Sequence, residues 1–213
     1  MRAKDTALHS GELPKSLPPI ELQHGQALWL LTQLGFRGSA SKSTFYEYIK
    51  SLRKLGTPFE RGKIGMARRG LAYYSYTHLM ELALVLSLRV YYVVPDVVLA
   101  EIVRHRRGLH SHYRRAYAER LNGIGAPIRV QAEGHRAFEM RGAYLDLKME
   151  FSGGTLVSFG PPNLVSPLEA ARIFAERNVG ARAFLPVNLS LMAESLVTAA
   201  LQAPRIRRGP RPL

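Results

Sequence analysis

Hydrophobic residues in the first half of the chain recur at helical spacing. Between residues 21 and 34 they mark one face of a short helix, which Gly35 closes. A turn of small residues follows, and Thr44 with Glu47 has the T-x-x-E spacing of a capping box. The pattern therefore predicts a second helix over residues 43–55, in the order helix, turn, helix.

The predicted second helix separates its side chains onto two faces, because successive residues turn by about 100°. One face is apolar and carries Phe45, Ile49 and Leu52. The other face is polar and carries Ser43, Tyr46, Lys50 and Arg53. We expect the apolar face to pack within the domain and the polar face to contact a partner.

Residues 57–74 have the composition of a basic hairpin. Glycines punctuate this segment, and its cations are Arg61, Lys63, Arg68 and Arg69. No Asp or Glu interrupts residues 61–74. We interpret the segment as a wing beside the helix-turn-helix.

Three more helices are predicted after the wing. Ser75 can cap a helix over residues 76–89 that is apolar on most sides and should form the core of the domain. Pro95 suits the first turn of a helix over residues 96–106. A further helix over residues 111–121 is rich in arginine and ends at an Asn-Gly pair.

The second half of the chain changes its period to that of strands. Residues 128–132 and 143–151 alternate between apolar and polar side chains. Gly153 and Gly154 link the second of these strands to residues 156–159 as a hairpin. This half is therefore predicted to contain a small sheet.

Two helices complete the predicted second half. Ser166 and Glu169 form an S-x-x-E capping box for a helix that runs to Arg177. Residues 187–201 form a last helix with an apolar stripe. A unit of under about a hundred residues need not cover such a stripe by itself, so we expect it to mediate dimerisation. The predicted contacts are Leu189, Met192 and Leu196.

These elements predict a mainly α protein with small β elements, built from a winged helix-turn-helix domain and a small α+β domain. The hydrophobic fraction of 46% is sufficient for a sizeable core. The predicted organisation is a flexible arm (1–20), the winged domain (21–107), a basic connecting helix (108–123), an α+β dimerisation or partner domain (124–203) and a basic tail (204–213).

The net charge points to a polyanionic partner. The 213 residues include 30 Lys and Arg against 16 Asp and Glu, which gives a formal charge of +14. Such a surplus creates a field that attracts polyanions, and nucleic acid is the first candidate. A ribosome-associated or membrane-surface protein could carry the same surplus, so charge alone does not decide among them.

Several classes of protein are disfavoured by what the sequence lacks. Without cysteine the chain has no disulfides, no thiolate metal ligands and no redox-sensing thiol. No apolar run approaches the roughly 20 residues of a membrane span, and the first twenty residues lack the apolar centre of a secretory signal. We expect a soluble, cytoplasmic, nucleoid-associated protein that has no membrane partner.

The residues of the first half resemble those of MerR-type transcription regulators. The matching motifs are S-T-F-Y-E-Y-I-K from Ser43 and G-L-A-Y-Y-S-Y-T-H-L-M from Gly70, followed by a leucine-rich stretch. The resemblance covers residues 22–107. It implies that the second helix enters the major groove, that the wing lies on the phosphate backbone and that a dimer binds a near-palindromic site. RNA polymerase is a second candidate partner for such a regulator.

The predicted DNA contacts come from the second helix, the turn before it and the wing. An α-helix fits the major groove, and flanking Lys and Arg neutralise phosphates. The predicted contact residues are Ser41, Lys42, Ser43, Thr44, Tyr46, Lys50, Arg53, Lys54, Arg61, Lys63, Arg68 and Arg69.

Catalysis and metal binding have weaker signals. His110 and His112 are two residues apart, so they point to different sides of a helix and do not form a metal pair. Asp146 and Glu150 share one face of a strand, where alternation places them on the polar exterior. We therefore expect no enzyme, no metal and no cofactor.

Two other functions remain open at this stage. An architectural or mobile-element accessory protein, such as an excisionase-like or plasmid-maintenance factor, would use a related winged fold to bend or coat DNA. An RNA- or ribosome-associated protein would use the basic tails. The ratio of specific to non-specific affinity distinguishes these functions from regulation, whereas salt dependence does not.

Overall fold

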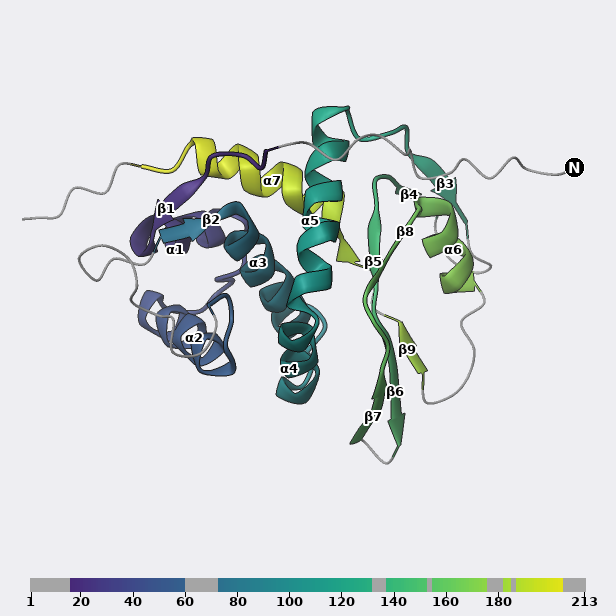
Figure 1. Ribbon diagram of the computed structural model, residues 1–213, viewed down its shortest axis with the longest axis horizontal. Helices are drawn as coiled ribbons and strands as arrows, with labels where there is room; N and C mark the ends of the chain where they lie inside the picture. Colours follow the sequence, from purple (N-terminus) through teal and green to yellow (C-terminus); the bar gives the residue numbers. More distant parts are fainter. Residues whose placement is uncertain are drawn as a thin grey trace, which may run out of the picture. The chain divides into compact units, whose positions relative to one another are not determined.

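Helices and small antiparallel sheets form the fold, so the protein is mainly α with small β elements, as the sequence predicts (Figure 1). The computed structural model describes residues 16–59, 73–131, 137–152, 155–175, 182–184 and 187–204. The chain divides into two compact units. The helical unit comprises Pro18–Arg104 and Glu194–Leu213, and the sheet unit comprises Met1–Leu17 and His105–Ala193.

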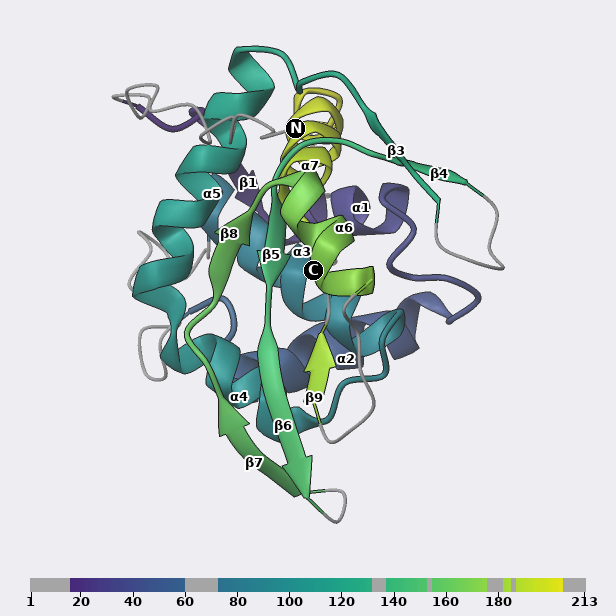
Figure 2. The same cartoon turned by 90° about the vertical axis from the view of Figure 1, so that its right-hand side faces the viewer.

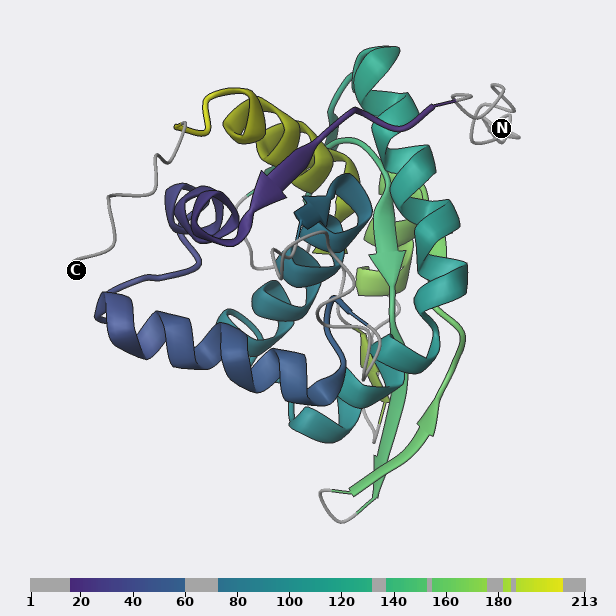
Figure 3. The same cartoon turned by 60° about the vertical axis from the view of Figure 1, so that its left-hand side comes forward.

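The helical unit contains the predicted helix-turn-helix region. Its elements are β1 (Glu21–Gln23), α1 (His24–Gln33), α2 (Lys42–Leu55), β2 (Tyr73–Ser75), α3 (Tyr76–Val90) and α4 (Asp96–Arg104). Strands β1 and β2 pair antiparallel, with Leu22 opposite Tyr74. Figure 3 shows β1, α1, the connecting turn and α2 in succession along the chain.

The start of the first predicted helix is wrong, because residues 21–23 form strand β1. Both Leu22 and its strand partner Tyr74 are buried, so pairing with a segment some fifty residues away overrides the helical pattern. The helix begins only after Gln23, whose backbone amide donates to the Gln26 side-chain carbonyl at 2.9 Å. A Gln-x-x-Gln cap lies outside the Ser or Thr pattern that marks a capping box in sequence.

Helix α2 also begins differently from the prediction. Ser41 is its N-cap and accepts a hydrogen bond from the Thr44 amide at 3.1 Å, so Thr44 lies inside the first turn. The predicted capping box between Thr44 and Glu47 is therefore wrong. The end of the helix is as predicted, since Gly56 follows it with a left-handed φ of 95°.

Removal of the Ser41 hydroxyl should destabilise the helical unit. Ser41→Ala leaves the Thr44 amide without its acceptor, and loss of an N-cap typically costs about 1 kcal/mol. The measurement is the free energy of urea unfolding, with Ser39→Ala as the control, because Ser39 is exposed in the turn before α2. Equal stabilities of the two variants would contradict the capping role.

Helix α3 is the core helix that the sequence predicts. All residues from Leu79 to Leu88 are buried, as is Tyr76 in the first turn. Ser75 is its N-cap as expected: the His78 amide donates to the Ser75 hydroxyl at 3.5 Å, and His78 Nδ1 accepts from the Ser75 amide at 3.3 Å. Helix α4 ends at Arg104, two residues before the predicted end.

The sheet unit combines two helices and small antiparallel sheets with the start of a third helix. Its elements are α5 (Arg106–Leu121), β3 (Ile128–Val130), β4 (Phe138–Met140), β5 (Tyr144–Asp146), β6 (Lys148–Ser152), β7 (Thr155–Phe159), β8 (Asn163–Val165), α6 (Pro167–Ala175), β9 (Arg182–Phe184), β10 (Val187–Asn188) and the first turns of α7 (Leu189–Leu201). The strand orders are β3-β4, β10-β5-β8 and β7-β6-β9. Figure 2 shows β5 running on into β6, and the β6–β7 hairpin.

The single strand predicted over residues 143–151 is divided at Leu147. Its first part, β5, pairs with β8 and β10, whereas its second part, β6, pairs with β7 and β9. Alternation along the chain gives no information about which sheet a strand joins, so this division was invisible in the sequence. The predicted hairpin is confirmed, because β6 and β7 pair antiparallel.

Helix boundaries in the sheet unit follow the predictions in part. Helix α5 begins at Arg106 and not at the predicted residue 111. Helix α6 is capped as expected, since the Glu169 amide donates to the Ser166 hydroxyl at 3.2 Å. The final helix begins at Leu189, and its residues from Glu194 onward belong to the helical unit.

Asp146 is not on the exterior, so that prediction is wrong. The residue is 1% exposed at the end of β5, and its carboxylate lies 3.6 Å from the Lys148 ammonium. Burial raises the pKa of Asp146, and the positive charge of Lys148 opposes that rise. The prediction failed because Asp146 belongs to β5 and Glu150 to β6, so the two are not on one continuous strand.

The apolar stripe of the last helix is not free to bind a second chain. Leu189 and Leu196 are fully buried in the single chain, and Met192 is partly buried. The expectation that a small domain leaves this stripe uncovered is therefore wrong. A dimer remains a prediction, but Leu189 and Leu196 do not supply its surface.

Candidate nucleic-acid interface

Helix α2 has the two faces that its sequence predicts. Phe45, Ile49 and Leu52 are at most 4% exposed and hold the helix against the helical unit. The exposed side chains are Lys42, Ser43, Thr44, Tyr46, Glu47, Tyr48, Lys50 and Lys54. We call this set, together with the half-buried Ser51, the α2 polar face.

The turn before α2 fixes where the polar face starts. Gly35 and Gly38 adopt φ values of 85° and 53°, a region that glycine enters without strain. The Ser41 hydroxyl then lies 2.9 Å from Ser43 Oγ and 2.8 Å from Thr44 Oγ1. Three hydroxyl groups thus meet at the N-terminus of α2, where backbone amides and the helix dipole favour anionic groups.

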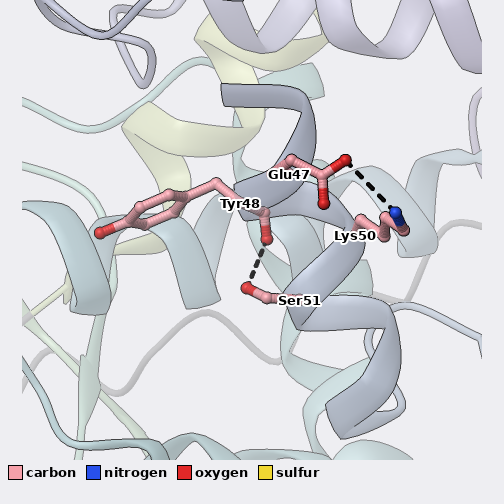
Figure 4. A network of polar contacts seen from close by, with 4 residues as sticks. All are labelled: Glu47, Tyr48, Lys50 and Ser51. Carbon is pink, nitrogen blue, oxygen red and sulfur yellow. Dashed lines mark hydrogen bonds and ion pairs between the residues drawn. The ribbon is translucent and has the colours of Figure 1, made fainter. Parts of the chain in front are cut away.

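Glu47 and Lys50 lie near the middle of the polar face (Figure 4). The Lys50 ammonium is 3.3 Å from Glu47 Oε1, and the two side chains are 55% and 64% exposed. An exposed ion pair at this spacing contributes little to stability and is readily exchanged for other partners. Both groups are therefore available to a ligand at low cost.

Tyr48 borders a shallow, open depression on the same face. The other residues that line this depression are Ser43, Thr44, Glu47 and Ser51. The Ser51 hydroxyl donates to the Tyr48 backbone carbonyl at 2.7 Å (Figure 4). The Arg89 guanidinium lies 5.0 Å from the centre of the Tyr48 ring and pairs with Asp96 at 3.1 Å. The cation–π contact with Arg89 thus holds the Tyr48 ring in its orientation.

Arg53 is not part of the exposed face, so its predicted place on the reading face is wrong. Its Nη2 donates to His24 Nδ1 at 2.7 Å and also donates to the Tyr74 hydroxyl. His24 Nδ1 and the Tyr74 hydroxyl are 3.0 Å apart. We call these three residues the Arg53 cluster. The cluster joins the end of α2 to the start of α1 and to β2.

The Arg53 cluster requires a neutral histidine. Arginine has no acceptor, so His24 Nδ1 must accept its hydrogen bond and the ring must carry its proton on Nε2. Burial, and secondly the positive charge of Arg53, lower the pKa of His24 from 6.5 to about 4. The Tyr46 ring packs edge-on against His24 with centroids 5.5 Å apart, so Tyr46 also touches the cluster.

Acid should weaken the helical unit through His24. Its pKa is lower in the folded chain than the roughly 6.5 of an unfolded histidine, so the unfolded state binds more protons between pH 6.5 and 4. The contribution to stability is fully present above pH 6.5 and declines as the pH falls toward 4. Unfolding midpoints in urea across this range should fall more in the natural chain than in His24→Gln.

The glutamine variant is a matched control because its side-chain carbonyl can accept from Arg53 without titrating. His110 and His112, whose pKa values burial also lowers, are present in both chains and cancel in the comparison. Identical pH dependence of the two chains would contradict the prediction.

The structure thus brings together one part of the predicted site. Ser41 is the N-cap, and Lys42, Ser43, Thr44, Tyr46, Lys50 and Lys54 are exposed on α2. The wing residues Arg61, Lys63, Arg68 and Arg69 lie outside the residues that the structure describes, as do the tip of the N-terminal arm and the end of the basic tail.

The sequence analysis missed three members of the polar face: Glu47, Tyr48 and Ser51. A signal for Glu47 was present, since it follows Ser43 by four residues and precedes Lys50 by three, which places all three on one helix face. Its assignment to a capping box concealed this. Ser51 follows Glu47 by four residues and so lies on the same side of the helix, whereas the contact of the Tyr48 ring with Arg89 is visible only in the folded unit.

Comparison of the chain with protein-family models, curated proteins and solved structures gives no match. The resemblance to MerR-type regulators therefore rests on the residues quoted above. In the described part of the chain no helix is both long and apolar enough to cross a membrane. Among the same residues, no group of three or more His, Asp or Glu side chains could hold a metal ion.

Proposed function

We propose that the protein is a sequence-specific, double-stranded DNA-binding transcription regulator that reads its site with α2. The observation that carries the proposal is the one-sided construction of this helix. One face is buried, and the opposite face combines hydroxyl, ammonium and carboxylate groups on a helix held by a cap at one end and by the Arg53 cluster at the other. Such a helix fits the major groove, where bases present distinct donor and acceptor patterns.

The groups of the polar face divide by chemistry. Lys50 can donate to guanine O6 and N7, and the Glu47 carboxylate can accept from the amino group of cytosine. Lys42 and Lys54, at the two ends of the face, suit phosphate oxygens on either side of the groove. Base-edge contacts would then come from the centre of α2 and positioning contacts from its ends.

The wing belongs to the same proposal. Strand β2, which pairs with β1, directly follows the segment that carries Arg61, Lys63, Arg68 and Arg69. These cations would contact the backbone beside the groove that α2 enters. Dimer formation and contact with RNA polymerase are further parts of the proposed regulation.

Selection of bound sites from a random duplex pool with the full chain tests the proposal. A recurring motif supports specific reading, and two-fold symmetry in that motif supports a dimer. Duplex binding without any motif would favour the architectural function instead. Absence of duplex binding at low salt would contradict DNA binding altogether.

A further inference from the structure

Helix α5 of the sheet unit carries a second strongly basic surface. Leu109, Tyr113 and Ala116 form its buried side. Its exposed side chains gather on the opposite side and include Arg107, Gly108, Ser111, Arg114 and Arg115. Arg107 and Arg114 are seven residues apart, nearly two turns, so they project in similar directions about 10 Å apart along the axis. We call this set the α5 arginine face.

The only acidic residue of α5 does not neutralise this face. Glu119 Oε2 accepts hydrogen bonds from the Ala143 amide at 3.0 Å and from the Ser190 hydroxyl, so it is engaged inside the sheet unit. Among the described residues, Arg107, Arg114 and Arg115 have no carboxylate within ion-pair distance. Their charges are therefore available to an external anion.

The arginines of α5 contribute to lowered pKa values of two histidines on the same helix, His110 and His112. Burial lowers the pKa of His110, and the positive charges of Arg106 and Arg114 lower it further. Burial is also the main cause of the lowered pKa of His112, with a smaller contribution from Arg115. His112 Nε2 donates to the Pro162 carbonyl at 3.0 Å, which anchors α5 to the connection between β7 and β8. The arginine face thus sits on a fixed helix.

We propose that the α5 arginine face is a binding site for the phosphate backbone of duplex DNA, distinct from α2. Guanidinium groups donate bidentate hydrogen bonds to phosphate oxygens, and they hold less water than ammonium groups. Gly108, which has no side chain, lies at the centre of the face. A Cβ added there would meet nothing within 4 Å, so the space above Gly108 is open and a phosphate backbone can approach the helix closely. The choice of duplex DNA as the ligand of this site rests on the proposed function.

The composition of the face favours a nucleic acid over a membrane or a protein. A helix that lies on lipid needs a broad apolar face toward the acyl chains. Here Leu109, Tyr113 and Ala116 are buried in the unit, and the exposed Leu121 at the end of α5 does not make such a face. A protein interface would place aromatic or aliphatic anchors at its centre, whereas this centre holds Gly108 and Ser111. Exposed arginines around a small centre match a phosphate backbone.

Salt dependence of the full chain tests the site. The variant Arg114→Gln with Arg115→Gln removes two charges from the face. The control, Arg129→Gln with Arg141→Gln, removes two exposed charges elsewhere in the sheet unit. Each lost phosphate contact lowers the log–log salt slope by about 0.9, so the first variant should lose up to about two units and the control almost none. The probes are a labelled duplex with the selected motif and a scrambled duplex of equal length.

A lysine variant separates charge from folding. Arg114→Lys with Arg115→Lys should keep most of the salt slope, and circular dichroism should show the same helix content in all variants. The preference for the motif over the scrambled duplex should not change in the glutamine variant, because phosphate contacts carry no sequence information.

The outcomes distinguish this inference from the proposed function. If the intact chain selects a motif but the glutamine variant keeps its slope, the α5 site is overturned and DNA reading by α2 stands. Equal losses in the variant and the control would also overturn it, because net charge would then explain both. A loss confined to duplex RNA, or to vesicles of phosphatidylcholine with phosphatidylserine, would assign the face to another partner. Failure of the intact chain to bind any duplex would overturn both proposals.

Discussion

Arg53→Ala should unfold the helical unit more readily than any exposed substitution on α2. The guanidinium donates to His24 Nδ1 at 2.7 Å and to the Tyr74 hydroxyl, and Tyr74 is fully buried. Removing the guanidinium breaks both contacts. The Tyr74 hydroxyl can still donate to His24 Nδ1, 3.0 Å away, so the loss is that of the hydrogen bonds to a charged group, at about 1.5–3 kcal/mol in the general case. We expect a loss of about 2–3 kcal/mol in the free energy of urea unfolding.

Lys54→Ala is the matched control, because the next residue along α2 has the same charge and is exposed. Its effect on stability should stay within about 0.5 kcal/mol, as is usual for surface sites. If the two variants were equally stable, the Arg53 cluster would not hold α2, and Arg53 would return to the set of free cations that can contact DNA.

Arg53→Lys sharpens the same test. Lysine keeps the charge, but its ammonium is more strongly hydrated than a guanidinium and lies at the end of a more flexible stem, so it is held less firmly against His24 and Tyr74. We therefore expect it to recover only part of the stability lost in Arg53→Ala. Full recovery would indicate that charge, and not the geometry of the guanidinium, stabilises the cluster.

Glu47→Gln should change which bases the protein prefers, if α2 reads DNA as proposed. The carboxylate can accept a hydrogen bond from cytosine N4. A glutamine amide can instead form two hydrogen bonds with adenine, accepting from N6 and donating to N7. One good side-chain contact to a base is worth about 1–3 kcal/mol of discrimination, so preference for cytosine at the contacted position should fall by about 10- to 100-fold. Site selection with the variant measures this directly.

Charge needs a separate control in that experiment, because Glu47→Gln also raises the net charge by one. Glu139→Gln makes the same change at an exposed position of the sheet unit. Both variants should bind non-specific duplex slightly more tightly, but only Glu47→Gln should alter the motif. An unaltered motif in Glu47→Gln would show that this carboxylate does not contact a base.

Local signals in the sequence determined several elements correctly. Ser75 and the continuous apolar run after it predicted α3, and Gly56 predicted the end of α2. The apolar positions Phe45, Ile49 and Leu52 predicted which face of α2 is buried. In each case neighbouring residues on one helix contain the information, because caps and faces depend on spacings of three and four residues.

Other features depend on residues that are far apart in the chain, and only the tertiary structure decided them. Strand β1 forms because residues 21–23 pair with β2, where Leu22 lies opposite Tyr74. Arg53 is not on the exposed face of α2 because its side chain donates hydrogen bonds to His24 and Tyr74. The burial of Asp146 and of Leu189 likewise depends on elements that pack around them. Periodicity indicates whether a side chain lies on the polar or the apolar face of its own helix or strand. It does not identify the residue that the side chain contacts, because that residue comes from a distant segment of the chain.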